Sequence, residues 1–167
     1  MFTHFISDTH FYHANIVEFC KRPFADVEAM NDALVSNIRN HTDERSVVLW
    51  LGDVFFCDVD RAQAIMRELP GRHVLVRGNH DGTASRMARC GFSAVVDQLT
   101  FQLNDQTIVA SHFPTTQRPQ DAVLMHGHTH STERLSPCGK RLHVGVDAWD
   151  YRPASIDEIL ALLSLEN

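Results

Sequence analysis

The chain has 167 residues, enough for one domain with a hydrophobic core and short for two, so we expect a single domain over residues 1–167. Hydrophobic residues make up 44% and charged residues 22%, which is typical of a globular protein. The net charge of −6 argues against a protein that coats duplex nucleic acid, because such proteins neutralise phosphates with a basic surface.

Hydrophobic periodicity predicts that strands and helices alternate in the first half of the chain. Asp26 precedes apolar residues at helical spacing, so we expect it to be the N-cap of an amphipathic helix. The expected elements are, in chain order, a strand at 2–7, helices at 13–20 and 26–40, a strand at 47–51, a helix at 62–69, a strand at 74–76 and a helix at 83–90.

The second half of the chain changes to shorter apolar runs, which predict strands. The polar sequence at 104–106 predicts a hairpin turn between two of them, and Ser155-Ile156-Asp157-Glu158 is typical of a capping box that begins a last helix. One α/β domain with two sheets fits this order best. The expected strands are 94–97, 99–103, 107–111, 123–126 and 142–146.

Five short motifs rich in His, Asp and Asn follow strand-like runs along nearly the whole chain. A single D-x-H sequence is more often a turn Asp with a nearby surface His than a metal site. The five motifs together supply the ligands of a site for two divalent cations, and such sites in hydrolases most often cleave phosphoesters. The motifs are Asp8-Thr9-His10, Gly52-Asp53, Gly78-Asn79-His80-Asp81, Ser111-His112 and Gly127-His128-Thr129-His130.

The spacing within two motifs suggests how each can bind an ion. Residues two apart at the end of a strand point the same way, so we expect Asp8 and His10 to bind one ion together, with the residue between them turned aside. The same argument applies to His128 and His130.

The central motifs add further candidates. Asp53 has two carboxylate oxygens that can bridge two ions, although a tight turn with Asp53 as a helix cap is the alternative. Asn79 offers a neutral oxygen ligand, whereas His80 beside it fits a role outside the ligand set. For Asp81, a hydrogen bond to His80 and an N-cap of the following helix are equally consistent with the sequence.

Charge and ligand type restrict the ions and the substrate. Two divalent ions carry four positive charges, and two aspartates with a bridging hydroxide carry three negative charges. The site therefore keeps a net positive charge, which suits a phosphate anion. Nitrogen and oxygen ligands without a thiolate favour two transition-metal ions over Mg or Ca, with Mn preferred and Fe, Zn, Ni or Co as alternatives.

The remaining composition points to a soluble intracellular protein. The four cysteines form no C-x-x-C pair, and we interpret them as reduced thiols of a cytoplasmic protein rather than as disulfides or a structural zinc site. No apolar stretch is long enough to cross a membrane. We expect no cleaved leader peptide, because cleavage would remove Asp8 and His10.

The motif set resembles the signature of the calcineurin-like metallophosphoesterase superfamily, which is D-x-H, G-D, G-N-H-[DE], a lone His and G-H-x-H. S-D-T-H-F-Y-H-A-N at 7–15 and G-V-D-A-W-D-Y-R-P at 145–153 are similar to sequences of its small bacterial and phage branch. The resemblance covers essentially the whole chain. It implies an α/β fold of two packed mixed β-sheets flanked by helices, a four-layer sandwich with the site at the strand ends.

The resemblance also implies a role for each motif residue. The first metal would be bound by Asp8, His10, Asp53 and His130. The second would be bound by Asp53, Asn79, His112 and His128, with Asp53 bridging. His80 would contact the phosphate and act as general acid toward the leaving oxygen, Asp81 would orient His80, and a metal-bound hydroxide would attack phosphorus in line.

Each polar residue beside the motifs has two possible roles. His13 and Asn15 could contact the substrate phosphate or be polar residues at the start of a helix. His126 and His143 fit core histidines better than residues that support the metal ligands from behind. Asp147 fits either a hydrogen-bond partner of a ligand histidine or a turn residue.

Aromatic and arginine side chains are common near the motifs. We expect more of the aromatic rings to lie in the core than to stack on a nucleobase. We expect most arginines to be solvated surface charges, Arg22 and Arg77 being the nearest in sequence to the motifs. The flanking aromatic residues are Phe11, Tyr12, Phe55, Phe56, Phe113, Trp149 and Tyr151.

The sequence therefore predicts a dimetal-dependent hydrolase of phosphodiesters or phosphomonoesters, with small nucleotide-like substrates. It predicts neither membrane binding nor stable binding of duplex nucleic acid, and it does not specify the oligomeric state. The alternatives are a non-catalytic metal-binding scaffold of the same fold and an amidohydrolase-type dimetal enzyme. The complete ligand set, including His80, favours the phosphoesterase over the scaffold, and the ligand order disfavours the amidohydrolase.

Overall fold

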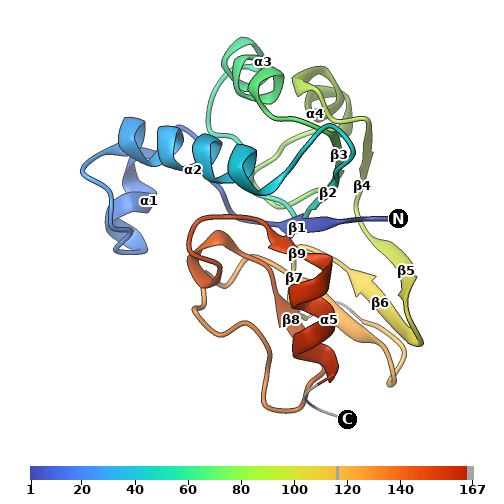
Figure 1. The fold of residues 1–167 in the computed structure, drawn as a ribbon. Coiled ribbons are helices and arrows are strands. Elements are labelled where there is room, and N and C mark those ends of the chain that lie inside the picture. Colours follow the sequence, from blue (N-terminus) through green and yellow to red (C-terminus); the bar gives the residue numbers. More distant parts are fainter. Residues whose placement is uncertain (116, 165–167) are drawn as a thin grey trace.

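The computed structural model describes residues 1–115 and 117–164, and two β-sheets form its framework (Figure 1). One sheet has five strands in the order β4-β3-β2-β1-β9, and the other has four in the order β5-β6-β7-β8. The first contains β1 (His4–Ile6), β2 (Val47–Trp50), β3 (Arg72–Val76), β4 (Ala94–Val96) and β9 (Ala154–Ser155). The second contains β5 (Leu99–Leu103), β6 (Gln106–Ala110), β7 (Val123–His126) and β8 (Arg141–His143).

Both sheets are mixed, as the sequence predicts. Strands β1 to β4 pair in parallel, and β9 is antiparallel to β1. In the second sheet, β6, β7 and β8 are parallel, and β5 forms an antiparallel hairpin with β6. The parallel strands carry their connecting loops to the same sheet edge at their carboxyl ends, where ligand sites commonly form.

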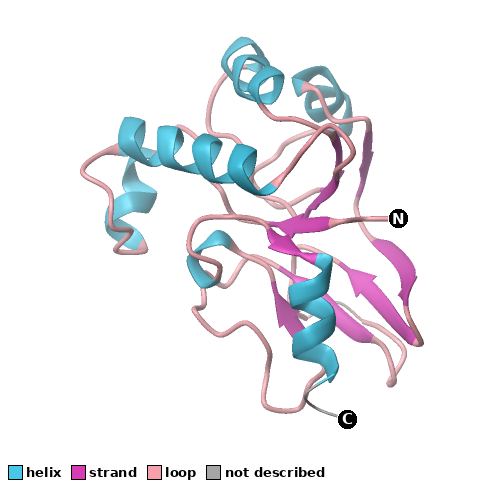
Figure 2. Cartoon of the chain, viewed as in Figure 1, coloured by secondary structure: helices cyan, strands magenta, loops and turns pink. Residues whose placement is uncertain are grey.

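Helices are drawn in cyan in Figure 2, and four of the described helices begin at a residue whose side chain accepts a capping hydrogen bond. Asp26 accepts a hydrogen bond from the backbone N–H of Ala29 at 2.8 Å, which confirms it as an N-cap. Ser155 and Glu158 exchange side-chain-to-backbone bonds and confirm the capping box. The helices are α1 (Ala14–Phe19), α2 (Val27–His41), α3 (Val59–Glu68), α4 (Ala84–Cys90), α5 (Ile156–Ser164) and a short 3₁₀ helix, η1 (Val146–Ala148).

Alternation along the strands divides the core between the two faces of the five-stranded sheet. One face packs against helices α2, α3 and α4 and includes Ile6, Trp50 and Leu75. The opposite face packs against the four-stranded sheet and α5 and includes Phe5, Leu49 and Val74. The two predicted packed sheets flanked by helices are therefore confirmed.

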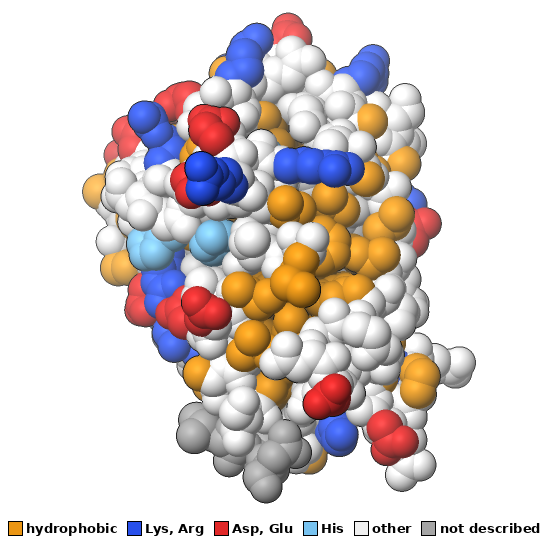
Figure 3. Space-filling model, turned by 45° about the vertical axis from the view of Figure 1, so that its right-hand side comes forward, with side chains coloured by type: hydrophobic (Ala, Val, Ile, Leu, Met, Phe, Trp, Pro, Cys, Tyr) orange, Lys and Arg blue, Asp and Glu red, His pale blue; other side chains and the backbone are white. Residues whose placement is uncertain are grey.

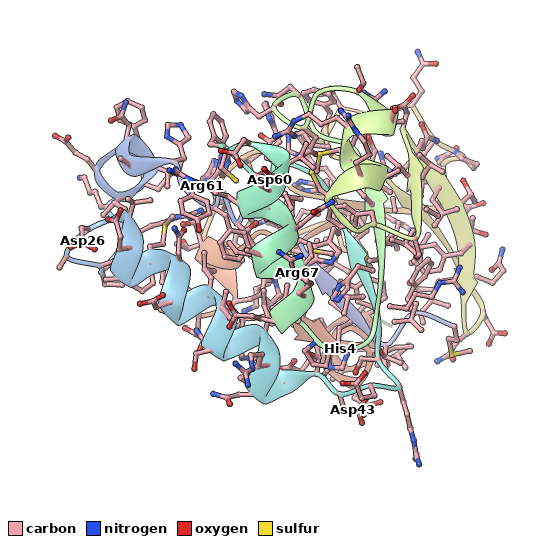
Figure 4. All side chains as sticks on the ribbon, turned by 90° about the horizontal axis from the view of Figure 1, so that it is seen from above. His4, Asp26, Asp43, Asp60, Arg61 and Arg67 are labelled. Carbon is pink, nitrogen blue, oxygen red and sulfur yellow. The ribbon has the colours of Figure 1, made fainter. Side chains whose placement is uncertain are left out.

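Helix α3 shows how the outer layer is built. Its buried side chains are Ala62, Ile65 and Met66. Asp60, Arg61 and Arg67 lie exposed along the same helix (Figure 4). This division gives the helix one apolar face toward the sheet and one charged face toward solvent.

Hydrophobic side chains also gather on the face that Figure 3 brings forward, beside β5 and α5. There the rings of Phe2 and Phe101 meet edge to face at 5.3 Å. In the described part of the chain, no helix combines the length and apolar character that a membrane span requires. The four cysteines are free, as predicted.

The chain departs from the expected strand at 142–146. Strand β8 ends at His143, and Gly145 then bridges to Ser7 beyond β1. The backbone N–H of Val146 donates to the carbonyl of Ser7 at 3.0 Å, and residues 146–148 turn into η1. The chain therefore leaves the second sheet to join the end of β1 in the first, a long-range pairing that periodicity cannot reveal. The two-residue strand β9 was likewise not predicted.

Candidate metal centre

The predicted ligands converge in two groups at the carboxyl ends of β1, β2, β3, β6 and β7. The ligand atoms of Asp8, His10 and His130 lie within 4.8 Å of one another. Those of Asp53, His112 and His128 do the same. Segments more than a hundred residues apart in the sequence thus meet at one end of the two sheets.

The distances within the second group fit a bound ion. The Nε2 atom of His112 lies 3.4 Å from Oδ2 of Asp53 and 3.2 Å from Nδ1 of His128. It lies 3.1 Å from Oδ1 of Asn79, which joins the group. Ligands about 2.1 Å from a tetrahedral or octahedral metal ion lie about 3.0–3.4 Å from one another. The three other donors therefore lie around Nε2 of His112 at distances that fit a shared coordination shell.

His10 supplies a separate indication in the first group. Both ring nitrogens are buried and have no hydrogen-bond partner among the described residues, and the residue is 2% exposed. Buried polar atoms are normally satisfied, so a pair of orphan nitrogens calls for an explanation. Burial lowers the pKa of His10 to about 3, which keeps the ring neutral and its lone pair available to a cation.

Two further histidines are held in the tautomer that a metal requires. Nδ1 of His112 contacts the carbonyl oxygen of Leu51 at 2.8 Å, and because a carbonyl only accepts, Nδ1 carries the proton. Nδ1 of His130 donates to the carboxylate of Asp147 at 2.8 Å in the same way. In both rings Nε2 is therefore unprotonated, and its lone pair is available to a metal ion.

Arg22 fixes the position of Asp147 and of the first motif. Its guanidinium makes two bonds of 2.9 Å to the Asp147 carboxylate, and it donates to the carbonyls of Asp8 at 2.7 Å and Thr9 at 3.0 Å. Arg22 is buried, so the expectation of a solvated surface charge is wrong for this residue. For Asp147, the structure favours the interpretation as a histidine partner over the turn residue.

The two aspartates of the groups differ in electrostatic environment. Burial raises the pKa of Asp8 to about 6, and both of its oxygens accept from the backbone N–H of His128 at 3.0 Å. Burial acts in the same direction on Asp53, but its contact with His112 and the backbone N–H of His80 bring the Asp53 pKa below its usual value. Asp53 is therefore ionised more readily than Asp8.

Asp81 connects the loops that follow β2 and β3. Its buried carboxylate accepts from the backbone N–H groups of Asp53 and Val54 at 2.9 Å and of Gly78 at 2.7 Å. In the described part of the chain it makes no hydrogen bond to the ring of His80. The alternative N-cap role is wrong, because Thr83 caps α4. Asp81 instead holds the Asp53 loop against the loop that carries His80.

His80 lies at the rim of the two groups. Its side chain is 46% exposed, and Nε2 lies 3.9 Å from Oδ2 of Asp53. The ring of His13 is also at the rim, 5.7 Å from that of His10. Asn15 is exposed in the first turn of α1, and within the described residues no hydrogen bond ties it to the site. His126 and His143 are buried, in line with the core interpretation.

The donors of Asp8 and His10 fall in one group as expected, whereas those of His128 and His130 fall in different groups. Neither pair has the expected strand geometry. Asp8 and His10 have φ angles of 58° and 52°, and His128 and His130 have 72° and 48°. These residues lie in left-handed turns beyond the strands and not on one face of an extended chain. Left-handed conformations of non-glycine residues are strained and gather at functional sites.

Glycine is required where these turns pack together. A Cβ atom on Gly127 would collide with Oγ of Ser7 and come within 2.5 Å of Oδ2 of Asp8. One on Gly78 would collide with Oδ1 of Asp53. The backbone thus approaches the carboxylates of Asp8 and Asp53 so closely that only glycine fits at these two positions.

A third group offers ligand atoms within 4.8 Å and was not predicted. It consists of Cys20, His130 and Asp147. Both oxygens of Asp147 are already bonded to Arg22, and burial raises the pKa of the Cys20 thiol, which disfavours the thiolate. The oxygen and nitrogen donors of the first two groups remain the better candidates.

Known proteins resemble this chain over most of its length. The family described as calcineurin-like phosphoesterase matches residues 3–144, a span that includes all the predicted ligands. An uncharacterized protein of Methanocaldococcus jannaschii is 31% identical, over 95% of this chain and 89% of that protein. The gene 66 protein of Mycobacterium phage L5 is 28% identical, over 97% of this chain and 94% of that protein. The crystal structure of a protein of unknown function from Aquifex aeolicus is 28% identical, covers 95% of this chain and 97% of that one, and has a TM-score of 0.75.

Proposed function

The chain belongs to the calcineurin-like phosphoesterase family, and we propose that it hydrolyses phosphoesters with two divalent transition-metal ions. The observation that carries the proposal is the pair of ligand groups on either side of Asp53. Oδ2 of Asp53 lies 3.8 Å from Nε2 of His10 and 3.4 Å from Nε2 of His112, so one carboxylate faces both groups.

The donor atoms suggest how the ions would be held. Asp53 would be shared between the two sets. Nitrogen and oxygen donors favour Mn, Fe, Zn, Ni or Co. When bound, such ions provide a nucleophile near neutral pH and offset the charge of the phosphate. One set would be Asp8, His10, Asp53 and His130, and the other Asp53, Asn79, His112 and His128.

His80 is the candidate general acid. The side chain is half-exposed and borders Asp53 without being one of the converging donors, so Nε2 can reach a bound substrate. A proton on this nitrogen would neutralise the oxygen that leaves phosphorus. The backbone N–H of His80 donates to Oδ1 of Asp53 at 2.9 Å, which fixes the start of the side chain relative to the ligands.

Three other residues would contribute to the site: one would position His80, and two would contact the phosphate. Asp81 would be a positioning residue, because it ties the loop of His80 to the loop of Asp53 through backbone hydrogen bonds. His13 would contact the phosphate from the rim, where its ring lies beside that of His10. Asn15 is a weaker candidate for phosphate binding, since it is exposed on α1.

The test is hydrolysis of bis-p-nitrophenyl phosphate and p-nitrophenyl phosphate with added Mn²⁺ and with a chelator. We expect metal-dependent release of p-nitrophenolate from the wild-type protein. Because p-nitrophenolate leaves without a proton, the acid role is tested on a phosphodiester with an alkyl leaving group, whose hydrolysis should fall by about 10²–10⁴-fold in His80→Ala. His41→Ala is the matched control, because His41 is exposed in the last turn of α2. Equal rates in the two variants would contradict the acid role. Two bound ions without any hydrolysis would favour a metal-binding scaffold.

A further inference from the structure

Exposed phenylalanine rings occur at the candidate metal centre. Phe56 is 36% exposed and Phe113 is 42% exposed. A third, Phe19, is 71% exposed but reaches only the ring of His13, at 6.4 Å. The other phenylalanines are buried or half-buried. An exposed aromatic ring beside a phosphate-binding site offers a stacking surface to a planar group of the substrate.

The ring of Phe56 belongs to the side of the centre that carries His80. Its centroid lies 4.9 Å from that of His80 and 5.3 Å from that of His10. The ring of His13 lies 4.0 Å away. Phe56 is therefore next to the candidate general acid and to the first ligand group.

The ring of Phe113 belongs to the other ligand group. Its centroid lies 5.1 Å from that of His112 and 4.9 Å from that of His128. Among the described ring contacts the two phenylalanines have different histidine neighbours, and Asp53 is close to one neighbour of each, 3.8 Å from His10 and 3.4 Å from His112. Each ligand group thus has an exposed aromatic ring beside it.

We propose that Phe56 and Phe113 bind the two organic arms of a phosphodiester, and that both arms end in planar groups such as nucleobases. This inference rests on the proposed function. A phosphomonoester has one organic arm and would leave one of the two rings unused. Stacking on a phenyl ring tolerates any base, because every base has a flat π face.

The position of His80 assigns the two arms. The general acid protonates the oxygen that leaves, so the leaving arm lies on the His80 side, against Phe56. The arm that stays on phosphorus lies against Phe113. Bond cleavage occurs between phosphorus and the leaving oxygen, water supplies the oxygen that replaces it, and the proton of His80 goes to the leaving alcohol.

Two esters with the same leaving group test this assignment. Bis-p-nitrophenyl phosphate and methyl p-nitrophenyl phosphate both release p-nitrophenolate, but only the first retains a planar arm. With Mn²⁺-loaded protein, the ratio of their kcat/KM values isolates the retained arm. Phe→Leu substitutions remove the flat ring and keep an apolar side chain, and thermal unfolding checks that the variants are folded.

We expect Phe113→Leu to lower the ratio of bis-aryl to methyl ester about ten-fold, the loss of one stacked ring. Phe56→Leu should lower kcat/KM for both esters about ten-fold and keep the wild-type ratio, because both esters have the same leaving arm. Phe101→Leu is the control, since its ring packs against Phe2 and Phe5. A dinucleoside phosphate should inhibit hydrolysis less well in Phe113→Leu than in wild type.

The outcomes separate this inference from the proposed function. Hydrolysis of neither ester by the wild-type protein would contradict the function and the inference together. Hydrolysis with an unchanged ratio in Phe113→Leu would overturn the two-ring assignment and leave the phosphoesterase intact. A wild-type preference for p-nitrophenyl phosphate over both diesters would also overturn it.

Discussion

Replacing Arg22 by Met should weaken the fold and the first ligand group together. The guanidinium is fully buried, and its partner Asp147 has a side chain that is 6% exposed. Methionine has a similar reach but donates no hydrogen bond, so the Asp147 carboxylate and the carbonyls of Asp8 and Thr9 lose the hydrogen bonds of the guanidinium. Removing one partner of a buried ion pair costs about 3–5 kcal/mol.

Urea unfolding with a chelator present measures this cost without a contribution from bound metal. For a chain of this length the loss corresponds to about 10 °C in Tm. The matched control is Arg39→Met, because the Arg39–Glu68 pair is 3.6 Å long and both side chains are more than half exposed. The control should cost less than about 1 kcal/mol. If Arg22→Met costs no more than the control, the buried network does not hold the site.

Three further predictions concern metal affinity and pH. Asp147→Asn should weaken metal binding about 10–100-fold in a chelator competition, because the carboxylate that orients His130 is lost; unchanged affinity would contradict that role. Burial raises the pKa of Asp8 to about 6, and a ligand must be deprotonated, so Mn²⁺ affinity should fall as pH drops below about 6, and a pH-independent affinity would refute this. The hydrogen bond from Arg152 lowers the pKa of Glu158 from 4.5 to about 2, so the carboxylate stabilises the fold above pH 4.5 and this contribution is lost as pH falls toward 2. Glu158 is more than a third exposed, so Glu158→Gln should cost about 1 kcal/mol at pH 7 and nothing near pH 2; a cost independent of pH would argue against the pair.

Local signals in the sequence predicted much of the fold. The N-cap at Asp26 and the capping box at Ser155 were predictable because their hydrogen bonds join residues three apart. The two sheets followed from alternating apolar runs. The prediction of a strand at 142–146 was wrong because Gly145 pairs with Ser7, a residue far away in the sequence.

The candidate site was predictable in composition and not in geometry. The motifs named the residues that converge, since each motif carries donor atoms of the right chemistry. Spacing encodes neither the left-handed turns at Asp8 and His128 nor the close packing of Gly127 against Ser7 and Asp8. Arg22 was missed because its partner Asp147 lies 125 residues away.

The most direct test of the central claim is the rate of bis-p-nitrophenyl phosphate hydrolysis as a function of the Mn²⁺ ions bound per chain. The two ligand groups that meet at Asp53 predict that the rate rises until two ions are bound and then stays constant. Full activity with one bound ion, or none with two, would contradict a dimetal phosphoesterase.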